Sequence, residues 1–100
     1  MKLENFSETI DLHGFLVADP VLVPAGTSPR TGKDYEAFAN LTFLPLNQRK
    51  TRDIAIDLRF LDEITAATKD MAQCERIVIT GNRDAQGHFR ATEVRPYAPQ

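Results

Sequence analysis

The sequence predicts a small all-β domain with one helix, closed into a five-stranded barrel. Two observations lead to this fold class. Stretches with apolar residues at every second position recur along the chain, and only residues 61–72 show the three- and four-residue spacing of a helix. The chain has 100 residues, of which 42% are hydrophobic and 26% are charged. We therefore expect a single domain over residues 1–100, with its core at about residues 8–96.

The stretch from Ala37 to Leu46, AFANLTFLPL, has the clearest two-residue period and predicts a central strand. Its inward set is Ala39, Leu41 and Phe43. Its outward set, which includes no charged residue, is Phe38, Asn40, Thr42 and Leu44. A face that contacted only water would carry charges, whereas this mixed surface suits a ligand that is partly flat and partly hydrogen-bonding. A nucleobase is such a ligand.

A first strand is predicted before the central one. Residues Thr9 to Val17, TIDLHGFLV, alternate around Gly14, which indicates a strand bent at the glycine. Asp19-Pro20 is expected to break this strand, and the pattern leaves open whether Val21 to Val23 continue it.

A loop is predicted between these two strands. Residues 25–34, AGTSPRTGKD, are rich in turn-forming residues. Two interpretations remain open: a solvated hairpin connection, or a basic finger in which Arg30 and Lys33 close over a ligand beside the sheet.

A third strand is predicted over residues 53–60, DIAIDLRF, after a polar and basic turn at residues 47–51. We expect Ile54, Ile56 and Leu58 to face the core. The outward set is then Asp53, Ala55, Asp57 and Arg59, because the opposite facing would bury two ionisable groups.

The second half of the chain predicts one helix and two more strands. The helix covers residues 61–72, with Asp62 and Glu63 near its start and Lys69 near its end, as the helix dipole favours. The later elements are a strand at residues 76–80 that ends at Gly81, a tight turn at 84–87, a strand at 88–94 that stops by Pro96, and a short extended tail. Three strands, a helix and two strands form the chain order of the OB-fold, a small Greek-key barrel.

The charge of the chain is unevenly distributed. Twelve Lys and Arg residues against 14 Asp and Glu residues give a net charge of -2 and a pI near 5.6, whereas nucleic-acid binders are more often basic. Residues 49–59, however, contain four cations and two anions. A local positive patch is compatible with a negative total.

Four motifs resemble, in order and spacing, the bacterial and phage single-stranded DNA-binding proteins. They are IDLHGFLVADP from Ile10, AFANLTFL from Ala37, ERIVITGNR from Glu75 and ATEV from Ala91. The resemblance covers about residues 8–95. It implies an OB-fold that binds single-stranded DNA by base stacking and phosphate contacts, in DNA replication, recombination or repair. It also implies a homodimer or homotetramer.

The candidate binding residues follow from this mode of binding. Flat side chains on an open face stack bases of any identity, and cations along the rim contact phosphates. Phe38 is the first stacking candidate and Phe15 the second, each against the alternative of a core aromatic. The full set is Phe15, Phe38, Tyr35, Asn40, Arg30, Lys33, Arg49, Lys50, Arg52 and Arg59.

The chain also departs from the family pattern. Ile54 lies where family members commonly carry a stacking tryptophan, and the match of Phe60 to the family's next aromatic is doubtful because it requires Asp57 and Arg59 to face inward. The turn DAQG is short, and the sequence shows no acidic tail of the kind that recruits repair and replication enzymes. With these differences, the chain resembles primosomal replication proteins, which are small OB-fold relatives without the tail, or diverged proteins of phages and mobile elements.

Catalysis and metal binding are not predicted. His13 and His88 have no cysteine or carboxylate at metal-ligand spacing, and GTSPRTGK lacks the Ser or Thr that a P-loop requires. We expect no enzyme activity and no cofactor. The lone Cys74, the absence of a signal-peptide pattern in MKLENFSETI and the lack of a membrane-spanning stretch predict a cytoplasmic protein.

Two functions of different classes therefore remain. One is a single-stranded DNA-binding module that uses the residues above. The other is an OB-fold protein-interaction subunit, whose apolar outer face packs on another chain and which binds nucleic acid weakly or not at all.

Overall fold

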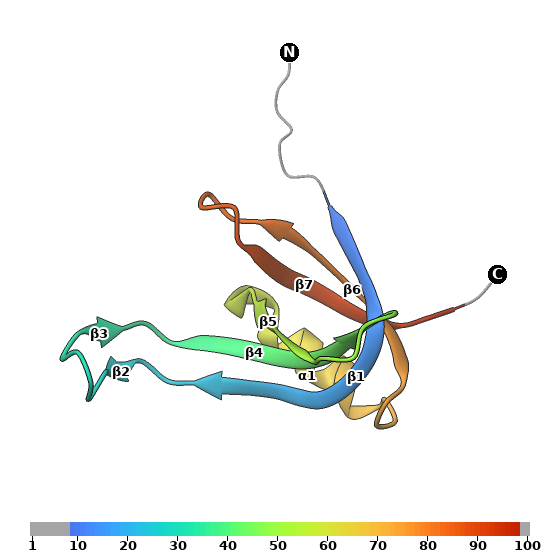
Figure 1. The fold of residues 1–100 in the computed structure, drawn as a ribbon, viewed down its shortest axis with the longest axis horizontal. Helices are drawn as coiled ribbons and strands as arrows, with labels where there is room; N and C mark the ends of the chain where they lie inside the picture. Colours follow the sequence, from blue (N-terminus) through green and yellow to red (C-terminus); the bar gives the residue numbers. More distant parts are fainter. Residues whose placement is uncertain (1–8, 99–100) are drawn as a thin grey trace, which may run out of the picture.

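The computed structural model describes residues 9–98, and the expectations for the first eight residues and for the end of the C-terminal tail lie outside this part. Its elements are β1 (Ile10–Val23), β2 (Gly26–Thr27), β3 (Asp34–Tyr35), β4 (Phe38–Pro45), β5 (Arg52–Ile56), the 3₁₀ helix η1 (Leu58–Phe60), α1 (Leu61–Lys69), β6 (Arg76–Arg83) and β7 (Phe89–Pro96). Five strands close a barrel in the order β1-β4-β5-β7-β6 (Figure 1). The predicted class, an OB-like all-β barrel with one helix, is confirmed.

The barrel is closed by strands that are far apart in the sequence. β1 pairs with β4 on one side and with β6 on the other, where Ile10 lies opposite Gly81. The parallel pair of β5 and β7 meets at Ile56 and Ala91. Gly14 is paired on both sides, and a Cβ there would lie 2.2 Å from the carbonyl oxygen of Leu44. Only glycine fits this close approach, which accounts for the predicted glycine position in a curved strand.

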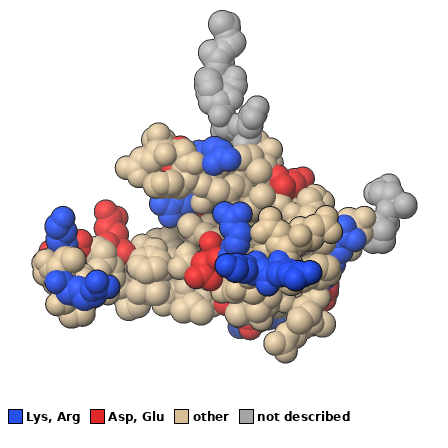
Figure 2. Space-filling model, viewed as in Figure 1, with Lys and Arg blue, Asp and Glu red and all other residues tan. Residues whose placement is uncertain are grey.

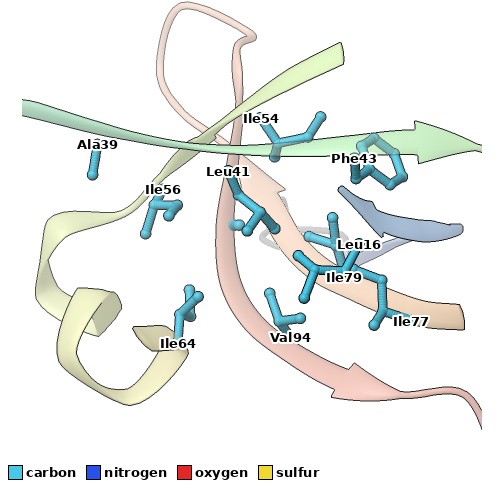
Figure 3. Packing of buried hydrophobic residues seen from close by; sticks show 11 residues of the cluster. Leu16, Ala39, Leu41, Phe43, Ile54, Ile56, Ile64, Ile77, Ile79 and Val94 are labelled. Atoms are coloured by element: carbon cyan, nitrogen blue, oxygen red, sulfur yellow. The ribbon is translucent and has the colours of Figure 1, made fainter. Parts of the chain in front are cut away.

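The core lies inside the barrel and follows the predicted alternation. Figure 3 shows side chains from the strands and from α1 pointing into one common interior. The largest fully buried side chains are Phe43, Leu41, Ile56, Ile64, Ile77 and Ile79. α1 packs mainly against β7 and β1 and contributes Ile64 to the cluster. Burial of this apolar surface is the main stabilising contribution to the fold.

The prediction that Asp19-Pro20 breaks the first strand is wrong. β1 continues to Val23, which lies opposite Phe38 on β4. Two register shifts, between Leu16 and Ala18 and between Ala18 and Val21, absorb the unpaired residues. Proline lacks a backbone N–H, and a bulge needs no ladder hydrogen bond at that position. β1 and β4 therefore run on together beyond the barrel, toward β2 and β3 (Figure 1).

The predicted loop at residues 25–34 is an ordered hairpin. β2 and β3 pair through Gly26 with Tyr35 and Thr27 with Asp34, and the Thr27 hydroxyl donates to the Asp34 carboxylate over 2.7 Å. The Gly32 N–H donates to the Ser28 carbonyl over 2.8 Å, within the turn. We call residues 24–37 the hairpin arm.

The third strand is shorter than predicted. β5 ends at Ile56, and the Asp57 carboxylate accepts a 3.0 Å hydrogen bond from the Arg59 N–H, which starts η1. Because this cap starts a helix, the strand alternation does not continue past Ile56. Leu58, which was expected in the core, is 45% exposed. The predicted facing holds within β5, where Ile54 is buried.

Two further boundaries differ from the prediction. α1 ends at Lys69, because the N–H groups of Asp70 and Met71 bond to carbonyls three residues back and tighten the last turn. β6 does not end at Gly81 but runs to Arg83, past a register shift between Thr80 and Gly81. No helix within residues 9–98 is long and apolar enough to span a membrane.

Candidate nucleic-acid interface

The outward residues of β4 and the residues of β1 that lie opposite them carry no charge. The four outward residues of β4 lie opposite residues of β1 in the pairs Phe38 with Val23, Asn40 with Val21, Thr42 with Ala18 and Leu44 with Phe15. Paired residues of antiparallel strands place their side chains on the same side of the sheet. The two strands together therefore present aromatic, aliphatic, amide and hydroxyl groups on one face, as predicted for β4 alone.

Two aromatic rings lie at the end of this face that adjoins the hairpin arm. Phe38 is 38% exposed and Tyr35 is 41% exposed, whereas Phe43 on the inward side of β4 is 1% exposed. The ring centroids of Tyr35 and Phe38 are 6.2 Å apart, with the rings edge to face. Phe38 is thus not a core aromatic, and the pair offers flat apolar surface to a ligand.

The turn of the hairpin arm carries two cations, whereas the two anions of the arm, Asp34 and Glu36, flank Tyr35 in the chain. Arg30 and Lys33 are both exposed, in the turn between β2 and β3. Figure 2 shows blue atoms at the tip of the lobe formed by this arm, with red atoms behind them. The structure brings together four of the predicted site residues at this end: Tyr35, Phe38, Arg30 and Lys33.

Phe15 and the cations Arg49, Lys50 and Arg52 lie at the opposite end of β4. Phe15 is half-buried between Leu44 of β4 and Arg76 of β6. The exposed Arg49, Lys50 and Arg52 follow the end of β4, and Figure 2 shows a blue band over the turn between β4 and β5. Six residues of strand separate Phe38 from Leu44, or about 20 Å. These three cations therefore form no rim around Phe38.

Two aspartates on the β5 side of the face have hydrogen-bond partners, and the partner of Asp57, Arg59, also carries a compensating charge. The Thr42 hydroxyl donates to Asp53 over 2.7 Å. Arg59 forms two side-chain hydrogen bonds with Asp57, Nε to Oδ1 at 3.1 Å and Nη2 to Oδ2 at 2.7 Å. These bonds are the main reason why the pKa of Asp57 is lowered. Desolvation acts in the opposite direction but does not outweigh them. Arg59 is still 80% exposed, so part of its guanidinium remains accessible.

The structure reveals a cleft that the sequence analysis missed. It has a volume of about 360 Å³ and lies between η1 and the turn that joins β6 to β7. Its lining residues are Asp57, Arg59, Asn82, Arg83, Asp84, Arg90 and Thr92. Arg83 and Arg90 flank the predicted turn at residues 84–87 in the sequence, and the placement of two arginines beside a short hairpin turn was the available signal.

The arginines of the cleft are held in place by hydrogen bonds. Arg90 Nε lies 3.1 Å from the Asp84 carboxylate, and Arg83 donates to the Gly87 carbonyl over 2.9 Å. The pKa of Asp84 is lowered chiefly by the His88 backbone N–H, and further by Arg90. Ordered guanidinium groups can bind phosphate oxygens at a lower conformational cost.

Two candidates remain, Phe60, whose match to the family is doubtful, and Asn40. Phe60 is half-buried and packs against the core, with the Arg59 guanidinium 5.5 Å from its ring centroid. Asn40 lies opposite Ala55 of β5, in the middle of the outer face. Within residues 9–98, no group of three or more His, Cys, Asp or Glu side chains is placed to hold a metal ion.

These features define a class: an OB-like barrel whose outer face combines exposed aromatic rings with ordered arginines. Comparison of the chain with protein-family models, with curated proteins and with solved structures gives no match.

Proposed function

We propose that this protein binds single-stranded DNA, in replication, recombination or repair, along the outer face of β1, β4 and β5. The observation that carries the proposal is the exposed pair of Tyr35 and Phe38 beside the basic tip of the hairpin arm. Bases stack on such rings at about 1–3 kcal/mol per base, whatever their identity. A duplex keeps its bases paired and stacked, so this mode of binding favours single strands.

The two ends of the proposed path carry cations. Arg30 and Lys33 lie on the hairpin side of Phe38. The cleft with Arg83 and Arg90 begins at Asp57, which follows Ile56, and Ile56 lies opposite Ala39 of β4. Asn40, between them, supplies an amide that can hydrogen-bond to base edges. The ion pair of Asp57 with Arg59 also supports the proposal, because it offsets one negative charge on this face.

A second candidate function rests on a different observation. Val21 and Leu22, where β1 extends beyond the barrel, are 60% and 53% exposed. Apolar residues on a projecting two-stranded ribbon also suit contact with another protein chain, including a second copy in a homodimer or homotetramer. In this alternative the protein is an interaction subunit of a larger complex.

One titration distinguishes the two functions. Fluorescence anisotropy of labelled oligo-dT and of a duplex of equal length is measured against protein at several salt concentrations. We expect preference for the single strand, with log affinity falling against log salt by about 0.7 for each phosphate contacted. Absence of binding at low salt would refute the proposal and favour the interaction subunit. Light scattering on the same samples then measures the oligomeric state.

A further inference from the structure

A second cluster of aromatic and cationic side chains lies on the outer side of β1 and β6. The guanidinium carbon of Arg76 is 3.8 Å from the centroid of the Tyr97 ring. The Tyr97 N–H donates to the Arg76 carbonyl over 3.0 Å, so the chain just after β7 stays alongside β6. The Tyr97 ring meets the His13 ring edge to face, with the centroids 6.4 Å apart.

This cluster combines a buried side chain, Val78, with an exposed one, Arg76. Val78 belongs to the outward set of β6, between His13 and Arg95, and yet is only 5% exposed. Tyr97 is half-buried, whereas Arg76 is exposed. The guanidinium therefore has an aromatic ring on one side and solvent access on the other. A cation over an aromatic ring is attracted to its π-face, which keeps this arrangement ordered.

The cluster continues the proposed DNA-binding face. Phe15 lies in register with Leu44 on one side and with Arg76 on the other, so these three side chains lie on the same side of the sheet. The Leu46 N–H donates to the His13 carbonyl over 3.1 Å and brings the β4–β5 turn to the same place. That turn carries the exposed cations Arg49 and Lys50.

We propose that a strand longer than the β4 face continues past Phe15 onto this cluster, where one base stacks on the open side of the Arg76 guanidinium. Bases stack on arginine planes as well as on aromatic rings, and the Tyr97 ring behind Arg76 holds that plane in position. Arg49 and Lys50 contact the adjoining phosphates. The proposal rests on the single-strand binding proposed above, and it gives a function to Arg49 and Lys50, which lie far from Phe38.

The test compares two lengths of oligo-dT by anisotropy. One has about 5 nucleotides, near the lower end of the range that one OB-fold occupies, and the other about 20, above that range. Arg76→Ala is expected to weaken binding of the longer strand about five- to tenfold, which is near the lower end of the effect of losing one stacked base. The affinity for the shorter strand should change by less than about twofold. Tyr97→Ala should act in the same way, with thermal unfolding as a check on the fold.

Two further variants separate stacking from charge. Arg76→Lys keeps the charge and loses the plane, so it should weaken the longer strand while leaving the salt slope unchanged. Lys69→Ala removes one cation from α1, on another part of the barrel, and should leave the affinity for both lengths unchanged.

The outcomes distinguish the two proposals. In one outcome, the wild-type protein binds both lengths of oligo-dT while Arg76→Ala leaves both affinities unchanged or lowers them equally. In that case the proposed continuation onto β6 is wrong, and the proposed single-strand binding is retained. Full retention of long-strand affinity by Arg76→Lys would also overturn it, because charge alone would then account for the contact. If the wild-type protein binds neither length, the function itself is wrong.

Discussion

Aromatic and cationic side chains lie near both ends of β4, but different parts of the fold support them. At one end, Tyr35 and Phe38 lie on a ribbon that projects from the barrel, and their cations are in a hairpin turn (Figure 1). At the other end, Phe15 and Arg76 lie on strands of the barrel itself, where β1 pairs with both neighbours. The comparison indicates that the first end is tolerant of sequence change and the second is not, although both combine flat groups with positive charge.

The largest expected effect is a loss of stability at the barrel end. Gly14→Ala would place a methyl group 2.2 Å from the Leu44 carbonyl oxygen and 2.8 Å from the Phe43 ring. We expect the free energy of unfolding to fall by about 3 kcal/mol, measured by urea denaturation. Gly32→Ala, in the hairpin arm, has no atom within 4 Å of the new group and only a left-handed backbone to strain. It should cost about 1 kcal/mol, and equal losses in the two variants would contradict the comparison.

The next effect is a loss of binding at the hairpin end. Phe38→Ala should weaken binding of oligo-dT by about 1–3 kcal/mol and leave the salt slope unchanged, because the ring contacts bases and not phosphates. Phe38→Leu is the matched control, since it keeps apolar volume without a flat ring. If Phe38→Leu binds as tightly as the wild-type protein, apolar contact and not stacking explains the surface.

Paired cation variants test the two ends against each other. Removing Arg30 and Lys33 together should reduce the salt slope by about 1.4 for short and long strands alike. Removing Arg49 and Lys50 should produce the same reduction for long strands only. A slope that neither double variant changes would show that the phosphates are contacted elsewhere.

The smallest effect concerns Asp57. Asp57→Asn keeps an acceptor for the Arg59 N–H and removes a negative charge, so the affinity for oligo-dT should rise severalfold by anisotropy. A fall in affinity would instead indicate that Asp57 positions Arg59 for binding.

The pH dependence of stability tests the same pair. Because Arg59 lowers the pKa of Asp57 in the folded state, the ionised carboxylate stabilises the fold above about pH 4, and this contribution is lost as the pH falls through the lowered pKa. The wild-type protein should therefore exceed Asp57→Asn in urea stability at pH 7, and the difference should disappear near pH 2. A difference that persists at pH 2 would show that the ion pair is not its source.

The sequence predicts the barrel because the two-residue period reports which side chains are buried. It fails where a local contact replaces that period. The carboxylate of Asp57 caps η1 and turns the chain after Ile56, and bulges carry β1 past Pro20. Neither event changes the hydrophobic pattern enough to be visible in it.

The candidate site, like the fold, was predictable only in part. Phe38 was identifiable because it belongs to an outward set of β4 that contains no charged residue. The cleft with Arg83 and Arg90 was not, because it forms only where β5 and β7 meet and the Asp57 N–H donates to the Ala91 carbonyl over 2.9 Å. That contact joins residues that are distant in the sequence, and periodicity carries no information about it.

The pairing of β1 with β6 also has a consequence for how the chain reaches its native state. The β1–β4 hairpin can form early, since its strands are close in sequence, but Ile10 finds Gly81 only after most of the chain is available. Long-range pairing of this kind slows folding, because a large loop must close before the contact contributes. In newly made chains, one edge of β1 therefore stays unpaired until β6 has been synthesised.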